Sequence, residues 1–204
     1  MIAAWRAALR DAKAERKWLA AGRPAPPPHV VKYRNIMAAA DIFGAQVFVE
    51  TGTANGDMVA RVLPRFERIV SIELFPPFAA AARRRFAGEA SVRIVEGDSA
   101  VRLGEAIDGI AERILFWLDG HYSGPGTGRG QQDSPVVAEI ATIARHRIQA
   151  GHRDLVLIDD ARLFAGENGY PALDAFMAGL ARDWDYNVAC ADDCIFALPK
   201  LTPR

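Results

Sequence analysis

Hydrophobic residues along the chain occur either in short unbroken runs or in longer segments with apolar positions three and four apart. The short runs are typical of buried parallel strands, and the longer segments are typical of amphipathic helices packed over such a sheet. The pattern predicts strands at 47–50, 68–73, 91–96, 113–118 and 155–158, and helices at 2–20, 30–43, 57–66, 76–86, 99–107, 133–149 and 172–182. Two last runs, 186–191 and 194–198, predict an antiparallel hairpin.

Strands and helices alternate five times before that hairpin, and this order predicts the fold class. We expect an α/β protein: a Rossmann-like, doubly wound three-layer sandwich whose seven-stranded sheet is mostly parallel and ends in the antiparallel hairpin. A length of 204 residues suits one such domain. The boundary is predicted at the proline-rich stretch 24–28, so that residues 1–28 form an N-terminal helix and linker and residues 29–204 form the domain.

The charge balance narrows the classes of partner. Acidic and basic residues number 25 each, so there is no excess of positive charge to hold a nucleic acid or an anionic membrane. No apolar run approaches the roughly 20 residues of a membrane span, and the first residues lack the apolar core of a signal peptide. We therefore expect a cytoplasmic protein. Cys190 and Cys194 flank the hairpin turn without a second Cys or His cluster nearby, and are expected to be free thiols.

The strand at 47–50 runs into a glycine-rich turn that is the first candidate for ligand binding. Residues 50–56 read E-T-G-T-A-N-G, an E-x-G-x-x-x-G spacing in place of the dinucleotide fingerprint G-x-G-x-x-G. The glycines let backbone approach a ligand, and the acid favours an ammonium group over a pyrophosphate. The motif resembles the first motif of class I S-adenosylmethionine-dependent methyltransferases. The resemblance implies cofactor contacts from Glu50, Thr51, Gly52, Thr53 and Gly56, although two glycines in a tight turn also fit a purely structural role.

Further predicted strands end in acids, and the carboxyl ends of parallel strands share one edge of a sheet. These acids should therefore converge on one crevice, where a cation or a ligand rich in hydroxyls would offset their repulsion. Glu73 is placed to accept two hydrogen bonds from a ribose diol, a device that NAD-binding folds share. Asp98 and Ser99 would receive the exocyclic amine of an adenine, with Leu74 as an apolar wall. Capping of the next helix by Asp98 or Ser99 is the rival explanation.

Three aspartates form a second group. Asp119 follows the fourth strand, and Asp159 and Asp160 follow the fifth, so their oxygens would make half an octahedral shell suited to Mg²⁺. The surrounding patterns L-D-G-H and L-I-D-D resemble metal-dependent O-methyltransferases, both catechol-type and macrocin-type enzymes acting on macrolide sugars. The resemblance spans about residues 40 to 200. It implies that the three aspartates are metal ligands and that Asp119 also takes part in catalysis.

The general base departs from the catechol-type pattern, in which a lysine closely follows the first aspartate. This chain has no lysine there, and His121 is the nearest candidate, with a supporting loop histidine as the alternative. Arg162, Leu163 and Phe164 would lie on the substrate side, together with the glycine-rich segment 123–132. That segment also fits a surface insertion without a role.

These features together predict methyl transfer from S-adenosyl-L-methionine to a hydroxyl of a small molecule or sugar, with Mg²⁺ assisting and His121 taking the proton. One alternative is a metal-dependent hydrolase that activates water with the aspartates and His121; Glu50 and Glu73 would then have no task. Another is a non-catalytic cofactor-binding module that engages a partner through the N-terminal helix. The tryptophans of that helix are also compatible with a homodimer formed through it.

Overall fold

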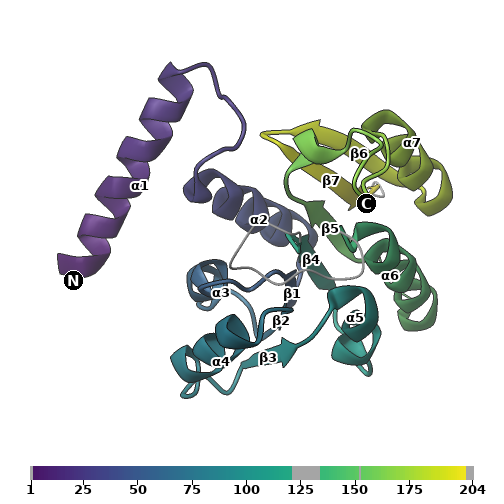
Figure 1. Ribbon diagram of the computed structural model, residues 1–204, viewed down its shortest axis with the longest axis horizontal. Helices are drawn as coiled ribbons and strands as arrows, with labels where there is room; N and C mark the ends of the chain where they lie inside the picture. Colours follow the sequence, from purple (N-terminus) through teal and green to yellow (C-terminus); the bar gives the residue numbers. More distant parts are fainter. Residues whose placement is uncertain (1, 121–133, 152, 201–204) are drawn as a thin grey trace.

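A computed structural model describes residues 2–120, 134–151 and 153–200 (Figure 1). The strands are β1 (Val47–Thr51), β2 (Arg68–Glu73), β3 (Val92–Glu96), β4 (Ile114–Leu118), β5 (Leu155–Ile158), β6 (Tyr186–Ala191) and β7 (Cys194–Pro199). They form one sheet in the order β3-β2-β1-β4-β5-β7-β6, in which β1 to β5 run parallel and β7 is antiparallel to both β5 and β6. The predicted seven-stranded, mostly parallel sheet with a C-terminal hairpin is confirmed.

Helices cover both faces of this sheet. They are α1 (Ile2–Ala20), α2 (His29–Phe43), α3 (Asp57–Val62), α4 (Pro76–Arg85), α5 (Ser99–Ile107), α6 (Val136–Ala150) and α7 (Leu173–Trp184), with a short 3-10 helix η1 (Ala161–Leu163). Figure 1 shows α2, α3 and α4 on one side of the sheet and α5, α6 and α7 on the other. The molecule is therefore the predicted three-layer, doubly wound sandwich.

The strand sequences explain the two layers, because alternate side chains point to opposite faces. In β4, Leu115 and Trp117 pack with α2 and α3, whereas Phe116 and Leu118 pack with α5, α6 and α7. Both sets are at most 3% exposed. A strand buried on both faces needs an unbroken apolar run, and this is the pattern that predicted β4 and β5.

Helix α1 lies beside the sandwich and is attached through a few contacts. Arg61 of α3 makes two hydrogen bonds with Asp11, at 2.8 and 3.0 Å, and the indole of Trp18 donates to the carbonyl of Pro24 at 2.7 Å. The helix ends at Ala20, as predicted, and Gly22 and Arg23 then turn the chain with left-handed φ angles of 82° and 61°. In the described part of the chain, neither α1 nor another helix has the length and apolar character to cross a membrane.

The end of α3 and the turn of the C-terminal hairpin show one wrong and one confirmed local prediction. Helix α3 was predicted to reach residue 66 but ends at Val62, because Pro64 lacks the N–H that the next helical hydrogen bond requires. The hairpin turns on Asp192 and Asp193, both with left-handed φ, and Cys190 and Cys194 on either side are free, as predicted.

A buried ion pair closes the edge of the sheet opposite the strand ends discussed below. Asp154, just before β5, accepts a hydrogen bond from the backbone N–H of Ile114 at 2.9 Å, and its other oxygen lies 3.2 Å from Nδ1 of His146. Nε2 of His146 lies 3.1 Å from the carbonyl oxygen of Ile110. Both ring nitrogens face acceptors, so the doubly protonated imidazolium satisfies the site best. These contacts give His146 a structural role.

His146 should make stability depend on pH. The hydrogen bond to Asp154 raises the pKa of His146 above its ordinary value of 6.5, against the opposing effect of burial. The folded state therefore holds this proton more tightly than the unfolded state, so the contribution is complete below pH 6.5 and is lost as pH rises through the raised pKa. We expect His146→Gln to lower the free energy of unfolding most at about pH 6 and less at about pH 9.

Urea denaturation at several pH values measures this difference. His29→Gln is the matched control, because His29 is exposed at the start of α2. A destabilisation by His146→Gln that is constant with pH would contradict the assigned charge state.

Candidate cofactor and cation site

The topology brings the predicted acids to one edge of the sheet. Glu50 is the penultimate residue of β1 and Glu73 is the last residue of the neighbouring β2, while Asp119 and Asp159 directly follow β4 and β5. Because β1 lies between β2 and β4, the two pairs of acids adjoin each other. The edge therefore carries two neighbouring acidic groups, one on β1 and β2 and one after β4 and β5.

Glu50 is almost fully buried, with 2% of its surface exposed. Ser71 Oγ donates to its carboxyl at 2.6 Å and also lies 2.6 Å from Thr53 Oγ1. Burial raises the pKa of Glu50 to about 8, opposed by the Ser71 hydrogen bond and reinforced by the charges of Asp119 and Glu73. In the protein alone this carboxyl is protonated at neutral pH, and a bound ammonium group would favour its ionised form.

Glu73 joins the two loops that follow β1 and β2. One carboxylate oxygen accepts from the backbone N–H of Ala54 at 2.7 Å, and the other accepts from that of Phe75 at 2.8 Å. Each carboxylate oxygen has a further lone pair, so the predicted hydrogen bonds to a ribose diol are compatible with this arrangement. Leu74, the predicted apolar wall, is half-buried beside it. Glu73 thus shapes the glycine-rich turn in addition to its predicted role.

The two glycines of that turn each have a packing reason. A Cβ on Gly52, whose φ is 87°, would lie 2.5 Å from the carbonyl oxygen of Asp119. A Cβ on Gly56, whose φ is 72°, would lie 2.7 Å from the ring of Phe86. Gly52 therefore allows the end of β1, with the fully buried Thr51, to approach the loop after β4.

The predicted adenine contacts lie at the start of α5. Asp98 caps this helix by accepting a hydrogen bond from the backbone N–H of Ala100 at 2.9 Å, and Ser99 is buried in the first turn. The capping explanation weighed for Asp98 thus describes its side chain in the structure. A role in adenine binding for Asp98 and Ser99 stays a prediction.

The three aspartates predicted to hold a metal do converge. One carboxylate oxygen from each of Asp119, Asp159 and Asp160 lies within 4.8 Å of the other two. Oδ1 of Asp159 is buried and has no hydrogen-bond partner in the described structure, which leaves it available to a cation. Hard oxygen donors in this arrangement fit Mg²⁺ or a similar divalent ion. The predicted base, His121, lies outside the described residues, as does segment 123–132.

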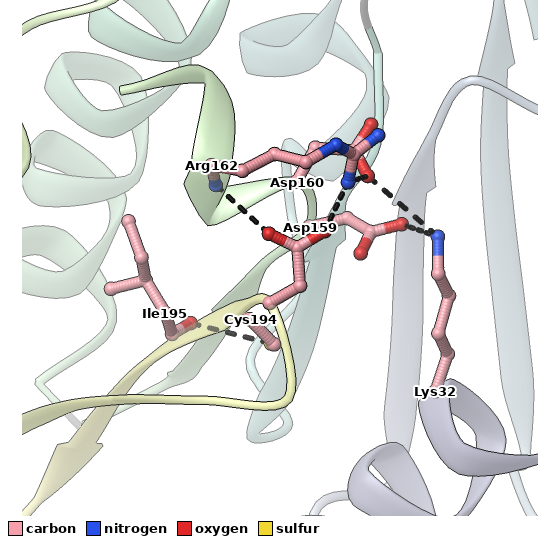
Figure 2. A network of polar contacts seen from close by, with 7 residues as sticks. Lys32, Asp159, Asp160, Arg162, Cys194 and Ile195 are labelled. Carbon is pink, nitrogen blue, oxygen red and sulfur yellow. Dashed lines mark hydrogen bonds and ion pairs between the residues drawn. The ribbon is translucent and has the colours of Figure 1, made fainter. Parts of the chain in front are cut away.

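A lysine that sequence analysis did not single out reaches this cluster. Lys32, in α2, forms an ion pair with Oδ2 of Asp159, and its Nζ lies 3.9 Å from Oδ1 of Asp160 (Figure 2). Burial raises the pKa of Asp159 to about 7; the charge of Asp119 adds to this effect and that of Lys32 opposes it. No sequence signal could have indicated Lys32, because 127 positions separate it from Asp159 and it belongs to no motif.

Of the residues after the paired aspartates, one differs from its predicted role. Asp160 has a left-handed φ of 57°, and its carboxylate is bound by Arg162 at 2.7 Å. Arg162 also pairs with Asp193 of the hairpin turn, so its guanidinium is held between the two carboxylates. Phe164 was expected to line the substrate side, but it is 4% exposed and packs in the core against Tyr170. The prediction for Phe164 was wrong because the 3-10 turn directs its ring inward.

Glu139 of α6 is a further residue at this edge that no sequence motif indicated. This side chain is 1% exposed, and its Oε1 has no hydrogen-bond partner in the described structure. Burial raises the pKa of Glu139 to about 7, against the opposing effect of the Ser99 and Thr51 hydroxyls. A signal was present, because Glu139 shares a helix face with the buried Val136 and Ile143, three positions before and four after it.

Solved structures with the same architecture identify the fold. SAH-bound methyltransferase PaMTH1 from Podospora anserina aligns with a TM-score of 0.58 at 19% identity, covering 83% of this chain and 78% of that chain. The O-methyltransferase TomG from Streptomyces achromogenes, involved in tomaymycin synthesis and solved with SAM, gives 0.57 at 15% identity, covering 93% and 89%. An O-methyltransferase from Bacillus cereus in complex with SAH gives 0.58 at 14% identity, covering 93% and 90%.

This chain has the class I methyltransferase fold. Its fold resembles that of S-adenosylmethionine-dependent O-methyltransferases in particular, as the sequence motifs indicated. No protein-family model matches the sequence, and no curated protein sequence matches it either. The assignment of the methyltransferase fold therefore rests on the arrangement of strands and helices.

The close approach at Gly52 gives a prediction for stability. Gly52→Ala would place a methyl group against backbone that cannot move away, in addition to the strain of a left-handed φ. We expect it to lower the free energy of unfolding by roughly 2 kcal/mol or more. Gly44→Ala is the matched control, because Gly44 has a similar φ of 68° and open space around its Cα; it should cost about 1 kcal/mol. Urea denaturation measures both, and equal costs would contradict the proposed steric constraint.

Proposed function

We propose that this protein transfers the methyl group of S-adenosyl-L-methionine to a hydroxyl oxygen of a small molecule or sugar, assisted by a divalent cation. The observation that carries the proposal is the adjacency of two acidic groups on one sheet edge. Glu50 and Glu73 suit the ammonium and ribose of the cofactor, and the three aspartates suit a cation beside it. Two of the similar structures bear the name O-methyltransferase, and the same two were solved with SAM or SAH.

Each group of site residues would have a distinct task in this reaction. Glu50 and Glu73 would hold the cofactor so that its sulfonium faces the aspartates, and Asp98, Ser99 and Leu74 would surround its adenine. Asp119, Asp159 and Asp160 would hold Mg²⁺, which supplies Lewis acidity to lower the pKa of an acceptor hydroxyl. The new O–CH₃ bond forms as the S–CH₃ bond breaks, and His121 is the predicted recipient of the hydroxyl proton.

The proposal also concerns the partners and the location of the protein. The balanced charges favour a small acceptor over nucleic acid or a membrane surface. Trp5 and Leu9 of α1 are 65% and 48% exposed, so a homodimer through this helix stays part of the proposal. A cytoplasmic location also stays a prediction.

Calorimetric titration with S-adenosylhomocysteine, with and without Mg²⁺, tests cofactor binding directly. We expect wild-type protein to bind SAH and Glu73→Ala to lose this binding. Asp160→Asn should bind SAH normally, and in a methyl-transfer assay its turnover should no longer depend on added metal. Glu73→Ala removes both the diol acceptor and the two hydrogen bonds that shape the turn.

The matched control for Glu73→Ala is Glu96→Ala, since Glu96 pairs with Glu73 in register at the end of β3 but is exposed. Wild-type protein that does not bind SAH under either condition would overturn the methyltransferase proposal and favour the hydrolase alternative. Binding without turnover on any hydroxyl acceptor would instead favour the non-catalytic module.

Cofactor affinity should also depend on pH through Glu50. A carboxyl with a pKa of about 8 is protonated at neutral pH, whereas an ammonium partner favours the ionised form. Binding below this pKa therefore releases a proton, and the affinity for SAH should rise with pH from about 6 to 8, by up to about tenfold per pH unit, and then level off.

The proton release can be measured by calorimetry in two buffers with different ionisation enthalpies. Glu50→Gln should bind more weakly and lose this pH dependence. A pH profile identical in Glu50→Gln and wild type would show that Glu50 does not meet the ammonium group.

A further inference from the structure

Lys32 approaches the aspartate cluster from a separate element. Its side chain leaves α2 and places Nζ against Asp159, with Asp160 at 3.9 Å (Figure 2). Lys32 is 12% exposed and Asp159 is 1% exposed at the side-chain level, so solvent screens this ion pair poorly. The ammonium group is therefore a strong local charge in the cluster.

A cation in the aspartate cluster would lie close to the ammonium group of Lys32. A metal bound to three carboxylate oxygens lies roughly 2.1 Å from each of them. Nζ of Lys32 contacts the second oxygen of Asp159, so a metal on this carboxylate would lie within a few ångströms of a positive charge. Repulsion at such a distance is strong in a poorly solvated site. Oδ1 of Asp160 also pairs with Arg162 at 2.7 Å, which adds a second positive charge to the cluster.

We propose that Lys32 is a built-in counter-ion that competes with divalent metal for the aspartate cluster. The ammonium group compensates Asp159 when no metal is bound, and its charge opposes a metal on the same carboxylate unless Nζ moves away. Coupling of this kind is reciprocal. A ligand that draws Lys32 away from Asp159 tightens metal binding, and bound metal tightens the binding of that ligand by the same factor. This inference rests on the metal site of the proposed function.

Titration of the protein with MnCl₂ alone, at fixed pH and without cofactor, tests this competition. Lys32→Met keeps most of the side-chain length and removes the charge, so we expect it to bind Mn²⁺ about tenfold or more tightly than wild type. Lys32→Arg keeps the charge and should stay close to wild type. Arg34→Met is the matched control, because it removes one positive charge from the same helix, where Arg34 pairs with Glu15; its Mn²⁺ affinity should not change.

Several results would overturn the inference. Unchanged or weaker Mn²⁺ binding by Lys32→Met would do so, and so would the absence of Mn²⁺ binding in every variant. Circular dichroism verifies folding, and Lys32→Gln takes the place of Lys32→Met if the latter does not fold. SAH titration of the same samples separates the two proposals: wild-type protein that fails to bind SAH while Lys32→Met binds Mn²⁺ more tightly would overturn methyl transfer and leave the competition intact.

Discussion

The candidate site depends on the parallel pairing of β1 with β2 on one side and β4 on the other. These ladders continue past the end of β1. The N–H of Gly52 donates to the carbonyl of Ile72 at 2.9 Å, and the N–H of Asp119 donates to the carbonyl of Thr51 at 3.1 Å. Because Gly52 has no Cβ, the loop after β4 can lie directly against it. This backbone contact brings the acids of β1 and β2 beside those after β4 and β5.

The same closeness creates an electrostatic problem that the chain solves in two ways. Burial of a charged carboxylate without a partner is costly, so such a group either takes up a proton or acquires a cation. Glu50 follows the first course, with its pKa raised to about 8. Asp159 follows the second, through Lys32. Both arrangements leave this edge of the sheet able to bind a positively charged ligand. A sulfonium, an ammonium group and a divalent ion all carry positive charge.

Fold and function have separate evidence in this protein. The similar solved structures, at 14–19% identity, establish the architecture, and one architecture can host unrelated activities. The proposed methyl transfer therefore depends on particular side chains and their positions. Glu50 and Glu73 distinguish the proposed enzyme from a simple metal hydrolase, while the aspartates distinguish it from a methyltransferase that needs no cation.

Local sequence by itself determined the sheet, the order of its elements and the meeting of the acids. An unbroken apolar run such as 114–118 predicts a buried parallel strand, and an acid just after it, such as Asp119, must lie at the shared edge. Helix α3 was predicted too long, although Pro64 was visible in the sequence.

Tertiary structure decided what each acid touches. Lys32 contacts Asp159, and Arg162 is held between two carboxylates, through elements that are distant in sequence. The burial of Phe164 depends on the turn after β5. Periodicity and motif spacing report which face of its own element a residue occupies. They carry no information about which side chain arrives from another element, because that depends on how the layers pack in three dimensions.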